Sequence, residues 1–394
     1  MEDDDRPPQP AALVPLPARV FPPPDRWPAA RNRVVNVVDV DMEHSVTAYL
    51  QEATDNPSRC YVRRKENLSV NLDLPDKVPV PLGRHGIKGE IIFCQVFLRD
   101  YDYTDGIVFR RSDFEVVIKK IRRWKVDPEI ENQRQGGPIV LDNPYNEIYV
   151  MQQYGNHENA MCCYDALCDD KYLYIVMLNV REGDLFYYVQ RGIGRNEIPD
   201  IVKKLVVNLQ YLQRHHLIHR DLKLENCVIR NPWIPFIDFA MTVQADVIEG
   251  EGQPRDVVYQ GRCGTEHYIS PEMHHVAQGR PFNYKCDVWA IGVTLWRLLT
   301  RMTLYDVPDI RDWSFLFFIR MGGFTNIDGM NQVLDTLLHP ANREQAYLRA
   351  RIQAAVVMPA VTRDLLARML QENPAQRSSL EEILDHPFFQ QQPG

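Results

Sequence analysis

The sequence contains no long apolar segment and no basic N-terminus. None of its apolar runs reaches the roughly 18 residues that a membrane-spanning helix requires. Residues 1–5 read MEDDD, whereas a secretory signal peptide opens with a positively charged region. We therefore expect neither a membrane segment nor a signal peptide.

Paired cysteines and an excess of basic residues are also missing. The eight cysteines include no C-x-x-C pair, and several lie in apolar runs, which predicts reduced thiols. Reduced thiols indicate an intracellular protein, in either the cytoplasm or the nucleus. The formal net charge is -8, from 45 Lys and Arg against 53 Asp and Glu. This balance argues against a nucleic-acid-binding surface and weakly favours basic partners.

The 394 residues are enough for two packed lobes with separate cores and additional segments. Residues 1–30 hold nine prolines, which predicts a disordered tail, with binding to a partner through 7–10 (PPQP) as a less favoured alternative. Residues 31–79 are interpreted as an N-terminal extension. Within it we expect a strand at 34–38 and a short helix at 45–53.

One stretch contains the groups that phosphoryl transfer requires. Residues 219–226 read HRDLKLEN, and 238–240 read DFA. In this stretch Asp221 can take the proton of an acceptor hydroxyl, Lys223 can contact the moving phosphate, and Asn226 with Asp238 can bind Mg²⁺ through oxygen atoms. The apolar runs 227–229 and 233–237 predict two short strands that bring Asn226 and Asp238 to neighbouring ends.

This stretch resembles the eukaryotic protein kinases, whose catalytic loop reads H-R-D-L-x-x-x-N and whose metal-binding Asp begins D-F-G. Lys223, two residues after Asp221, is typical of the serine/threonine type. The resemblance implies an α+β fold of two lobes, a small β-rich N-lobe with one key helix at 80–178 and a larger, mainly helical C-lobe at 179–390. It also implies ATP and Mg²⁺ as cofactors and a protein substrate with a Ser or Thr acceptor.

The nucleotide-binding residues follow from the same resemblance. Glycine allows backbone N–H groups to approach phosphates, and Gly83, Gly86, Gly89 and Ile91 resemble the glycine-rich loop, although the first glycine position falls on Arg84. A glycine-rich hairpin turn is an equally common reading of this stretch. Residues 114–119 (FEVVIK) resemble the strand that carries the ATP lysine, here Lys119. The resemblance also implies that Val117 narrows the adenine slot and that Met177 is the gatekeeper. The hinge backbone at Asn179 would bind adenine, and Val228 and Leu185 would lie around its ring. Asp184 would contact the ribose or a basic substrate side chain. In another fold the apolar members would simply be core residues.

A buried lysine needs a counter-ion, and we expect Glu147 to supply it. Asn143 is a credible N-cap, Pro144 is suited to the first helical position, and Gly155 can end the helix. Glu129 and Glu131 lie nearer to Lys119 in the sequence, but in a Pro- and Gly-rich stretch with poor helical support. Their helix is not expected.

Residues 264–272 (GTEHYISPE) resemble the end of a kinase activation segment, which positions a peptide. The resemblance implies an ion pair of Glu272 with Arg377, support of the catalytic-loop backbone by Asp287, and packing of His219 against Phe239. Residues 323–350 are interpreted as an insert without an assigned function.

Two departures bear on activity and its regulation. Ala240 replaces a glycine that would allow a positive φ. Arg220 predicts a basic pocket for a phosphorylated residue, yet 241–262 offer only Thr242 and Tyr259. The four carboxylates Asp246, Glu249, Glu251 and Asp256 lead to the hypothesis that one of them supplies the negative charge permanently.

Two alternatives to an active protein kinase stay open. One is a pseudokinase scaffold that binds ATP without efficient turnover, and the other is a small-molecule kinase, which the peptide-positioning segment disfavours. Within the kinase interpretation, Glu225 and Asp184 suggest basic residues near the acceptor hydroxyl.

Overall fold

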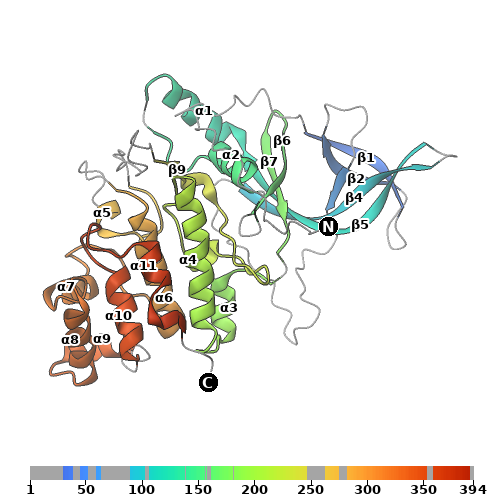
Figure 1. Ribbon diagram of the computed structural model, residues 1–394. Coiled ribbons are helices and arrows are strands. Elements are labelled where there is room, and N and C mark those ends of the chain that lie inside the picture. Colours follow the sequence, from blue (N-terminus) through green and yellow to red (C-terminus); the bar gives the residue numbers. More distant parts are fainter. Residues whose placement is uncertain are drawn as a thin grey trace, which may run out of the picture.

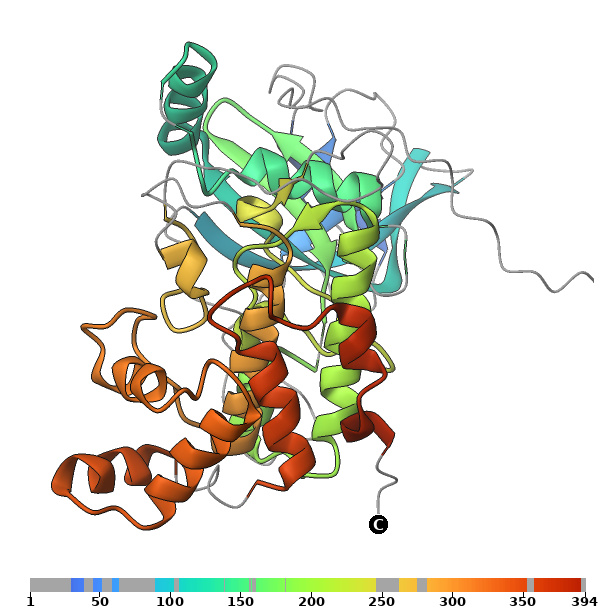
Figure 2. The ribbon, with the colours of Figure 1, turned by 60° about the vertical axis from the view of Figure 1, so that its left-hand side comes forward.

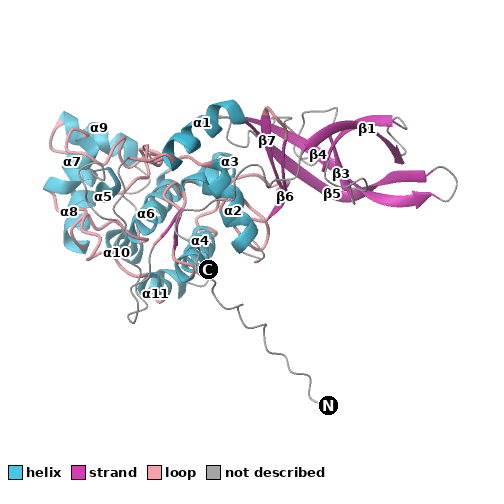
Figure 3. Cartoon of the chain, turned by 90° about the horizontal axis from the view of Figure 1, so that it is seen from above, coloured by secondary structure: helices cyan, strands magenta, loops and turns pink. Residues whose placement is uncertain are grey.

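The computed structural model describes residues 30–38, 45–51, 59–63, 89–102, 106–137, 139–155, 157, 161–180, 182–245, 262–274, 282–352 and 358–390. A β-sheet with two helices forms one lobe, and a group of helices forms the other (Figures 1 and 3). This arrangement confirms the expected two-lobed α+β fold. In the described ranges, no helix has the length and apolar character needed to cross a membrane.

The N-lobe contains a seven-stranded sheet in the order β1-β2-β3-β4-β5-β7-β6. Its strands are β1 Ala30–Val38, β2 Ser45–Gln51, β3 Arg59–Arg63, β4 Gly89–Asp102, β5 Gly106–Arg122, β6 Cys163–Cys168 and β7 Tyr172–Leu178. The long β4 and β5 form an antiparallel hairpin, with a register shift between Gln95 and Phe97.

The N-terminal extension contributes three of these strands. β1 pairs with β2 and also, in parallel, with β5 through Val37–Phe109 and Val38–Arg110, so β1 to β5 close into a ring. The strand expected at 34–38 is therefore present within β1. The helix expected at 45–53 is wrong, because this segment is β2 and pairs on both sides. Its β-branched and aromatic residues Val46, Thr47 and Tyr49 favour a strand once partners are available.

Alternation along β5 separates a core face from a site face. Val116 and Ile118 point into a cluster with Ile92, Cys94 and Tyr61. Successive side chains of a strand point to opposite faces. Val117 and Lys119 consequently share the other face, the one that faces the catalytic residues.

Two helices accompany the sheet: α1 Arg123–Arg134 and α2 Pro144–Tyr154. For α2 the predicted start and end are confirmed, since the Asn143 side chain accepts a hydrogen bond from the Tyr145 N–H and Gly155 is the C-cap. The expectation that the stretch with Glu129 and Glu131 is not helical is wrong, because both residues lie in α1. Val126 and Ile130, one helical turn apart, are buried, and this tertiary packing outweighs the poor helix propensity of the segment.

The C-lobe is mainly helical, and α4 lies beside α6 and α11 (Figure 2). Its elements are α3 Leu185–Arg191, α4 Ile198–Arg214, β8 Leu217–Ile218, η2 Leu224–Asn226, η3 Phe239–Met241, β9 Val243–Gln244, α5 Pro271–His274, α6 Lys285–Thr300, α7 Trp313–Arg320, α8 Ile327–Leu338, α9 Arg343–Ile352, α10 Ala360–Met369, α11 Leu380–Leu384 and η5 Pro387–Gln390. The central α6 is almost wholly buried, including Trp289 and Trp296. It supports the loops that carry the candidate site.

The strands expected at 227–229 and 233–237 form only in part. Cys227 bridges to Phe236 and Arg230 to Trp233, both antiparallel. Pro232 and Pro235 have no N–H to donate, so a continuous ladder cannot extend along this segment. The backbone still brings the two ends together, because Ile237 N–H donates to the Asn226 carbonyl at 3.0 Å.

Several sequence predictions lie outside the described residues. They are the Pro-rich tail at 1–29, the glycine-rich turn with Gly83, Arg84 and Gly86, and the four acidic residues of the activation segment together with Tyr259.

Candidate active site

Lys119 lies between two carboxylates from different parts of the chain. Its Nζ is 2.7 Å from Glu147 Oε2, on α2, and 2.9 Å from Asp238 Oδ1. The Glu147 side chain is 1% exposed and that of Asp238 is 39% exposed. Glu147 therefore anchors the lysine from the interior, while the Asp238 carboxylate is partly exposed to solvent. Glu129 and Glu131 are exposed on α1.

These three charges shift one another's protonation. Burial alone would lower the pKa of Lys119, but Asp238 and Glu147 together raise it above its ordinary value. Lys119 holds the pKa of Asp238 below its ordinary value against the effect of burial. Burial raises the pKa of Glu147 to about 7, although Lys119 acts to lower it. Lys119 is thus a permanent cation, and Asp238 is the more firmly ionised of its two partners.

The Asp221 carboxylate is oriented from three directions. Oδ1 accepts a hydrogen bond from Thr265 Oγ1 at 2.7 Å, and Oδ2 accepts from Lys223 Nζ at 2.8 Å. Asn226 Nδ2 donates to the Asp221 carbonyl at 2.8 Å and to Oδ2 at 3.2 Å. Lys223 Nζ also donates to Thr265 Oγ1 at 2.9 Å. Fixing a carboxylate in this way prepares it to accept one particular proton.

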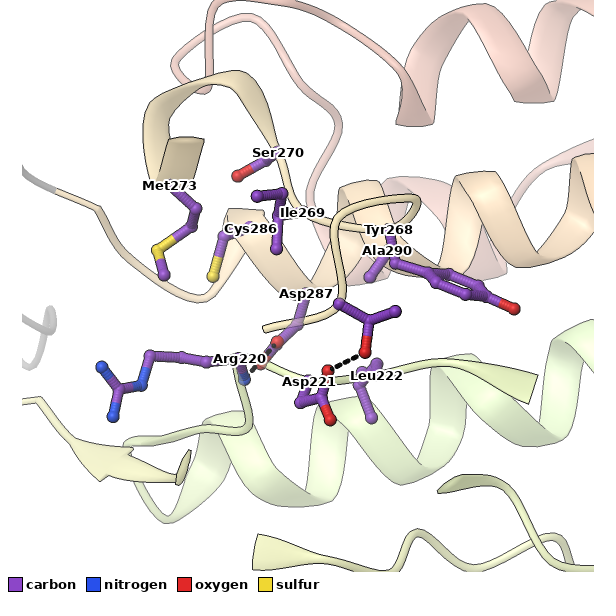
Figure 4. Close-up of a pocket in the computed structure, with 11 residues that line it drawn as sticks. Arg220, Asp221, Leu222, Tyr268, Ile269, Ser270, Met273, Cys286, Asp287 and Ala290 are labelled. Carbon is purple, nitrogen blue, oxygen red and sulfur yellow. Dashed lines mark hydrogen bonds between the residues drawn. The ribbon is translucent and has the colours of Figure 1, made fainter. Parts of the chain in front are cut away.

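The catalytic loop is held to α6 by Asp287. Its carboxylate accepts hydrogen bonds from two backbone N–H groups of this loop. The His219 N–H donates to Oδ2 at 2.7 Å. The Arg220 N–H donates to Oδ1 at 2.9 Å (Figure 4). Burial raises the pKa of Asp287 to about 7, against the effect of these two donors. Arg220 has a φ of 68°, a backbone conformation that non-glycine residues adopt only when their surroundings impose it.

Arg220 and His219 connect this loop to the segment after Asp238. Arg220 Nε donates to the Met241 carbonyl at 2.5 Å. His219 packs against Phe239 with ring centroids 5.0 Å apart, and its Nε2 is 3.1 Å from the Ile237 carbonyl oxygen. Burial lowers the pKa of His219. A buried, uncharged histidine is suited to packing rather than to proton transfer.

Asn226 and Asp238 offer the chemistry of a Mg²⁺ site. Asn226 donates through Nδ2, which leaves its amide oxygen available, and Asp238 carries an ionised, partly exposed carboxylate. Hard divalent cations prefer such oxygen ligands. The residues present therefore fit the metal that the resemblance implies.

The residues expected to contact adenine lie on the site face of the sheet and in the C-lobe. Ile91 lies directly opposite Lys119 on the β4–β5 ladder, and Met177 lies opposite Val117 on the β5–β7 ladder. Directly opposite residues share a face. On the C-lobe side, Val228 and Leu185 are buried in one core cluster.

Two expected nucleotide contacts are engaged elsewhere. The Asn179 N–H donates to the Glu115 carbonyl at 3.1 Å, so the hinge at this residue is attached to the end of β5. Asp184 is 2% exposed and its side chain caps α3 through the Tyr187 N–H at 2.8 Å. Burial raises the pKa of Asp184 to about 6, and Glu225 adds to this effect.

The end of the activation segment is attached to the C-lobe by the predicted ion pair. Glu272 and Arg377 are both buried, with separations of 2.7 and 3.1 Å between their paired atoms. Gly264 has a φ of 94°, and a Cβ there would lie 2.6 Å from the Arg220 carbonyl oxygen. Only glycine permits this close approach to the catalytic loop.

Beneath this segment a cavity of about 10 Å³, large enough for about one water molecule, is lined by Asp221, Ser270, Cys286 and Asp287 (Figure 4).

Sequence reasoning did not assign a role to Thr265, which joins Asp221 and Lys223. The sequence feature that could have indicated this role is the Gly264-Thr265 pair at the end of the activation segment. The Thr265 hydroxyl reaches the Asp221 carboxylate only because the chain folds back over 44 residues. Ala240 raises no difficulty in this conformation. It lies in the short helix η3, and the positive φ, 66°, belongs to Asp238 instead.

The two-lobed fold thus brings together an ion-paired lysine, an aspartate fixed by hydrogen bonds and two side chains with oxygen atoms for a metal. These are the groups that a phosphoryl-transfer site requires. Residues 107–389 match the family described as protein kinase domain. The match covers more than half of the sequence, and the chain belongs to this family.

Three relatives illustrate the similarity. A probable serine/threonine-protein kinase of Dictyostelium discoideum is 29% identical over 61% of this chain and 24% of its own length. The mitosis inducer protein kinase cdr1 of Schizosaccharomyces pombe is 28% identical over 64% of this chain and 36% of its own length. Ribosomal protein S6 kinase alpha-2 of Mus musculus is 25% identical over 77% of this chain and 36% of its own length. The chain thus spans from about a quarter to just over a third of the length of these relatives.

Proposed function

We propose that this protein is a serine/threonine protein kinase that transfers the γ-phosphate of ATP to protein hydroxyls. The observation that carries the proposal is the orientation of Asp221 by Lys223, Thr265 and Asn226. An acceptor hydroxyl adds one more donor to this carboxylate, which aligns the hydroxyl and takes its proton as the new P–O bond forms.

The two lysines act on the phosphates. Lys119, held by Glu147, binds the α- and β-phosphates, and Lys223 contacts the γ-phosphate as it moves from the nucleotide to the acceptor oxygen. Asn226 and Asp238 would hold Mg²⁺, which would neutralise phosphate charge when bound. The contribution of the protein is positioning and charge stabilisation, with no covalent intermediate.

The remaining nucleotide contacts are part of the same proposal. Gly83, Gly86 and Gly89 would cover the phosphates, while Ile91, Val117, Met177 and Val228 would enclose adenine beside the hinge backbone. The lobe boundaries proposed for the kinase domain are 80–178 and 179–390, with the extension at 31–79 as an addition to the sheet of the first lobe. The Pro-rich tail remains a candidate partner-binding segment. The seven cysteines with described side chains are free thiols, which favours an intracellular location.

A basic context around the acceptor is the finer proposal for the substrate. Glu225 Oε2 is buried and accepts no hydrogen bond from the described residues. A buried carboxylate oxygen without a donor is costly, and a lysine or arginine of the substrate would satisfy it.

The test is transfer of labelled γ-phosphate to an arrayed peptide library with Mg²⁺. We expect transfer to Ser and Thr peptides, reduced by roughly 10²- to 10⁴-fold in Asp221→Asn and comparably in Lys119→Met. ATP binding without transfer would instead establish the pseudokinase scaffold, and transfer to free hydroxy metabolites but to no peptide would establish a small-molecule kinase.

A further inference from the structure

A half-buried arginine lies beside the proposed acceptor site and pairs with no carboxylate among the residues that the structure describes. Arg297, near the C-terminal end of α6, donates from Nη1 to the Tyr268 hydroxyl. It forms no ion pair with any carboxylate in the part of the chain that the structure describes. A guanidinium carries five N–H donors, so most of its hydrogen-bonding capacity is available.

Two aromatic rings determine how this guanidinium lies. Its Cζ is 5.1 Å from the ring centroid of Tyr268 and 5.7 Å from that of Phe186, on α3. Cation–π contacts engage the charge but leave the N–H groups at the edge of the plane unbonded. These edge donors match the two oxygens of a carboxylate or a phosphate.

Tyr268 connects Arg297 to the catalytic loop. The Leu224 N–H donates to the same hydroxyl oxygen at 3.3 Å, and Leu224 directly follows Lys223. Tyr268 is also three residues from Thr265, which is bonded to Asp221. The Tyr268 side chain therefore links Arg297 to the groups that would hold the acceptor.

Glu225 acts on the same tyrosine hydroxyl as Arg297. Burial raises the pKa of Tyr268, Glu225 raises it further, and Arg297 lowers it, so both charges act on this hydroxyl. Arg297 and Glu225 are not paired with each other, although they have opposite charges. Each can therefore bind a group of opposite charge on a peptide.

We infer that Arg297 is a specificity-determining residue that binds an acidic side chain, a carboxylate or a phosphate, close to the acceptor hydroxyl of the substrate. This inference rests on the proposed kinase function. A charge-assisted, two-point hydrogen bond in a partly buried site discriminates strongly against a neutral residue. The substrate would then carry one acidic and one basic residue near its acceptor, matched by Arg297 and Glu225.

The experiment measures kcat/KM for Ser peptides in which each position within three residues of the acceptor is Ala, Lys, Asp or phosphoserine. We expect the intact protein to prefer Asp or phosphoserine over Ala at one position by roughly tenfold. Preference for both residues identifies a general anion site, and preference for phosphoserine alone identifies phosphate as the ligand.

Three variants separate recognition from a purely structural role. In Arg297→Gln the ratio of kcat/KM for the acidic peptide to that for the Ala peptide should fall to about one. Arg297→Lys should retain part of the preference for an acidic residue. Arg297→Glu should prefer Lys at the same position instead. Arg320→Gln, which removes an exposed arginine at the end of α7, is the matched control and should retain the full preference.

Transfer by the intact protein without an acidic preference at any position would overturn the inference and leave the kinase function standing. An acidic preference that persists in Arg297→Gln would overturn it as well. No transfer to any peptide would overturn the proposed function, and the inference with it. Because the first comparison uses the intact protein, a variant that fails to fold does not prevent a decision.

Discussion

At the scale of single residues, Asp184 shows how burial makes a carboxyl sensitive to pH. It caps α3 from a buried position, and burial raises its pKa to about 6, so the folded protein holds the proton more tightly than the unfolded chain. As the pH rises from about 4, the unfolded chain ionises first. The free energy of unfolding therefore falls by about 2 kcal/mol between pH 4 and pH 6 and stays lower above that window.

The corresponding prediction concerns Asp184→Asn. The variant should lack this loss, so the difference in unfolding free energy between wild type and variant should shift by about 2 kcal/mol in favour of the variant from pH 4 to pH 7. Urea unfolding at several pH values measures this shift. Asp328→Asn, at an exposed position of α8, is the control. Parallel pH curves for wild type and Asp184→Asn would contradict the prediction.

Glu147 gives a second residue-scale prediction. Glu147→Gln removes the negative charge that positions Lys119, and we expect kcat to fall by roughly 10²-fold because a misplaced cation no longer meets the phosphates. Glu131→Gln should change kcat little, because Glu131 is exposed on α1. Steady-state kinetics on a common peptide compare the two. Equal losses in both variants would show that Glu147 is not the partner that matters.

At the scale of elements, the end of the activation segment depends on an ion pair between distant parts of the chain. Arg377, with no exposed side-chain surface, pairs with Glu272 and also donates to the Lys285 and Gln371 carbonyls at 2.6 and 2.8 Å. Arg377→Met leaves Glu272 as an uncompensated buried charge. We expect a loss of about 3–5 kcal/mol of unfolding free energy.

An exposed ion pair within one helix provides the matched control. Arg368, half exposed, pairs with Asp364 one turn earlier in α10 at 2.9 Å. Arg368→Met should cost less than about 1 kcal/mol, because water screens and solvates both charges. Denaturant titrations of the two variants test the contrast, and losses of similar size would contradict it.

At the scale of the whole molecule, both lobes contribute to the nucleotide site, so binding should stabilise the folded protein. ATP at a hundredfold excess over its Kd should add about 2.7 kcal/mol to the free energy of unfolding. We expect this stabilisation to require Mg²⁺ and to disappear with EDTA or in Asp238→Asn. Thermal melting measures it, with Asp170→Asn, an exposed carboxylate, as the control. Equal stabilisation with EDTA would exclude Asp238 as a metal ligand.

Local signals determined much of this protein from the sequence alone. The catalytic loop places Asp221, Lys223 and Asn226 within six residues, and the start and end of α2 depend on the neighbouring residues Asn143, Pro144 and Gly155. Such features depend on nearby residues, so spacing and residue type suffice to predict them.

Tertiary structure decided the rest, because the relevant partners are far apart in the sequence. β2 is a strand because β1 and β3 pair with it, and α1 is a helix because Val126 and Ile130 find a core. Thr265 meets Asp221 across 44 residues. Arg297 acquires its place beside Tyr268 only when α6 packs under the activation segment. No local periodicity encodes such contacts, and only the packed chain brings these groups together.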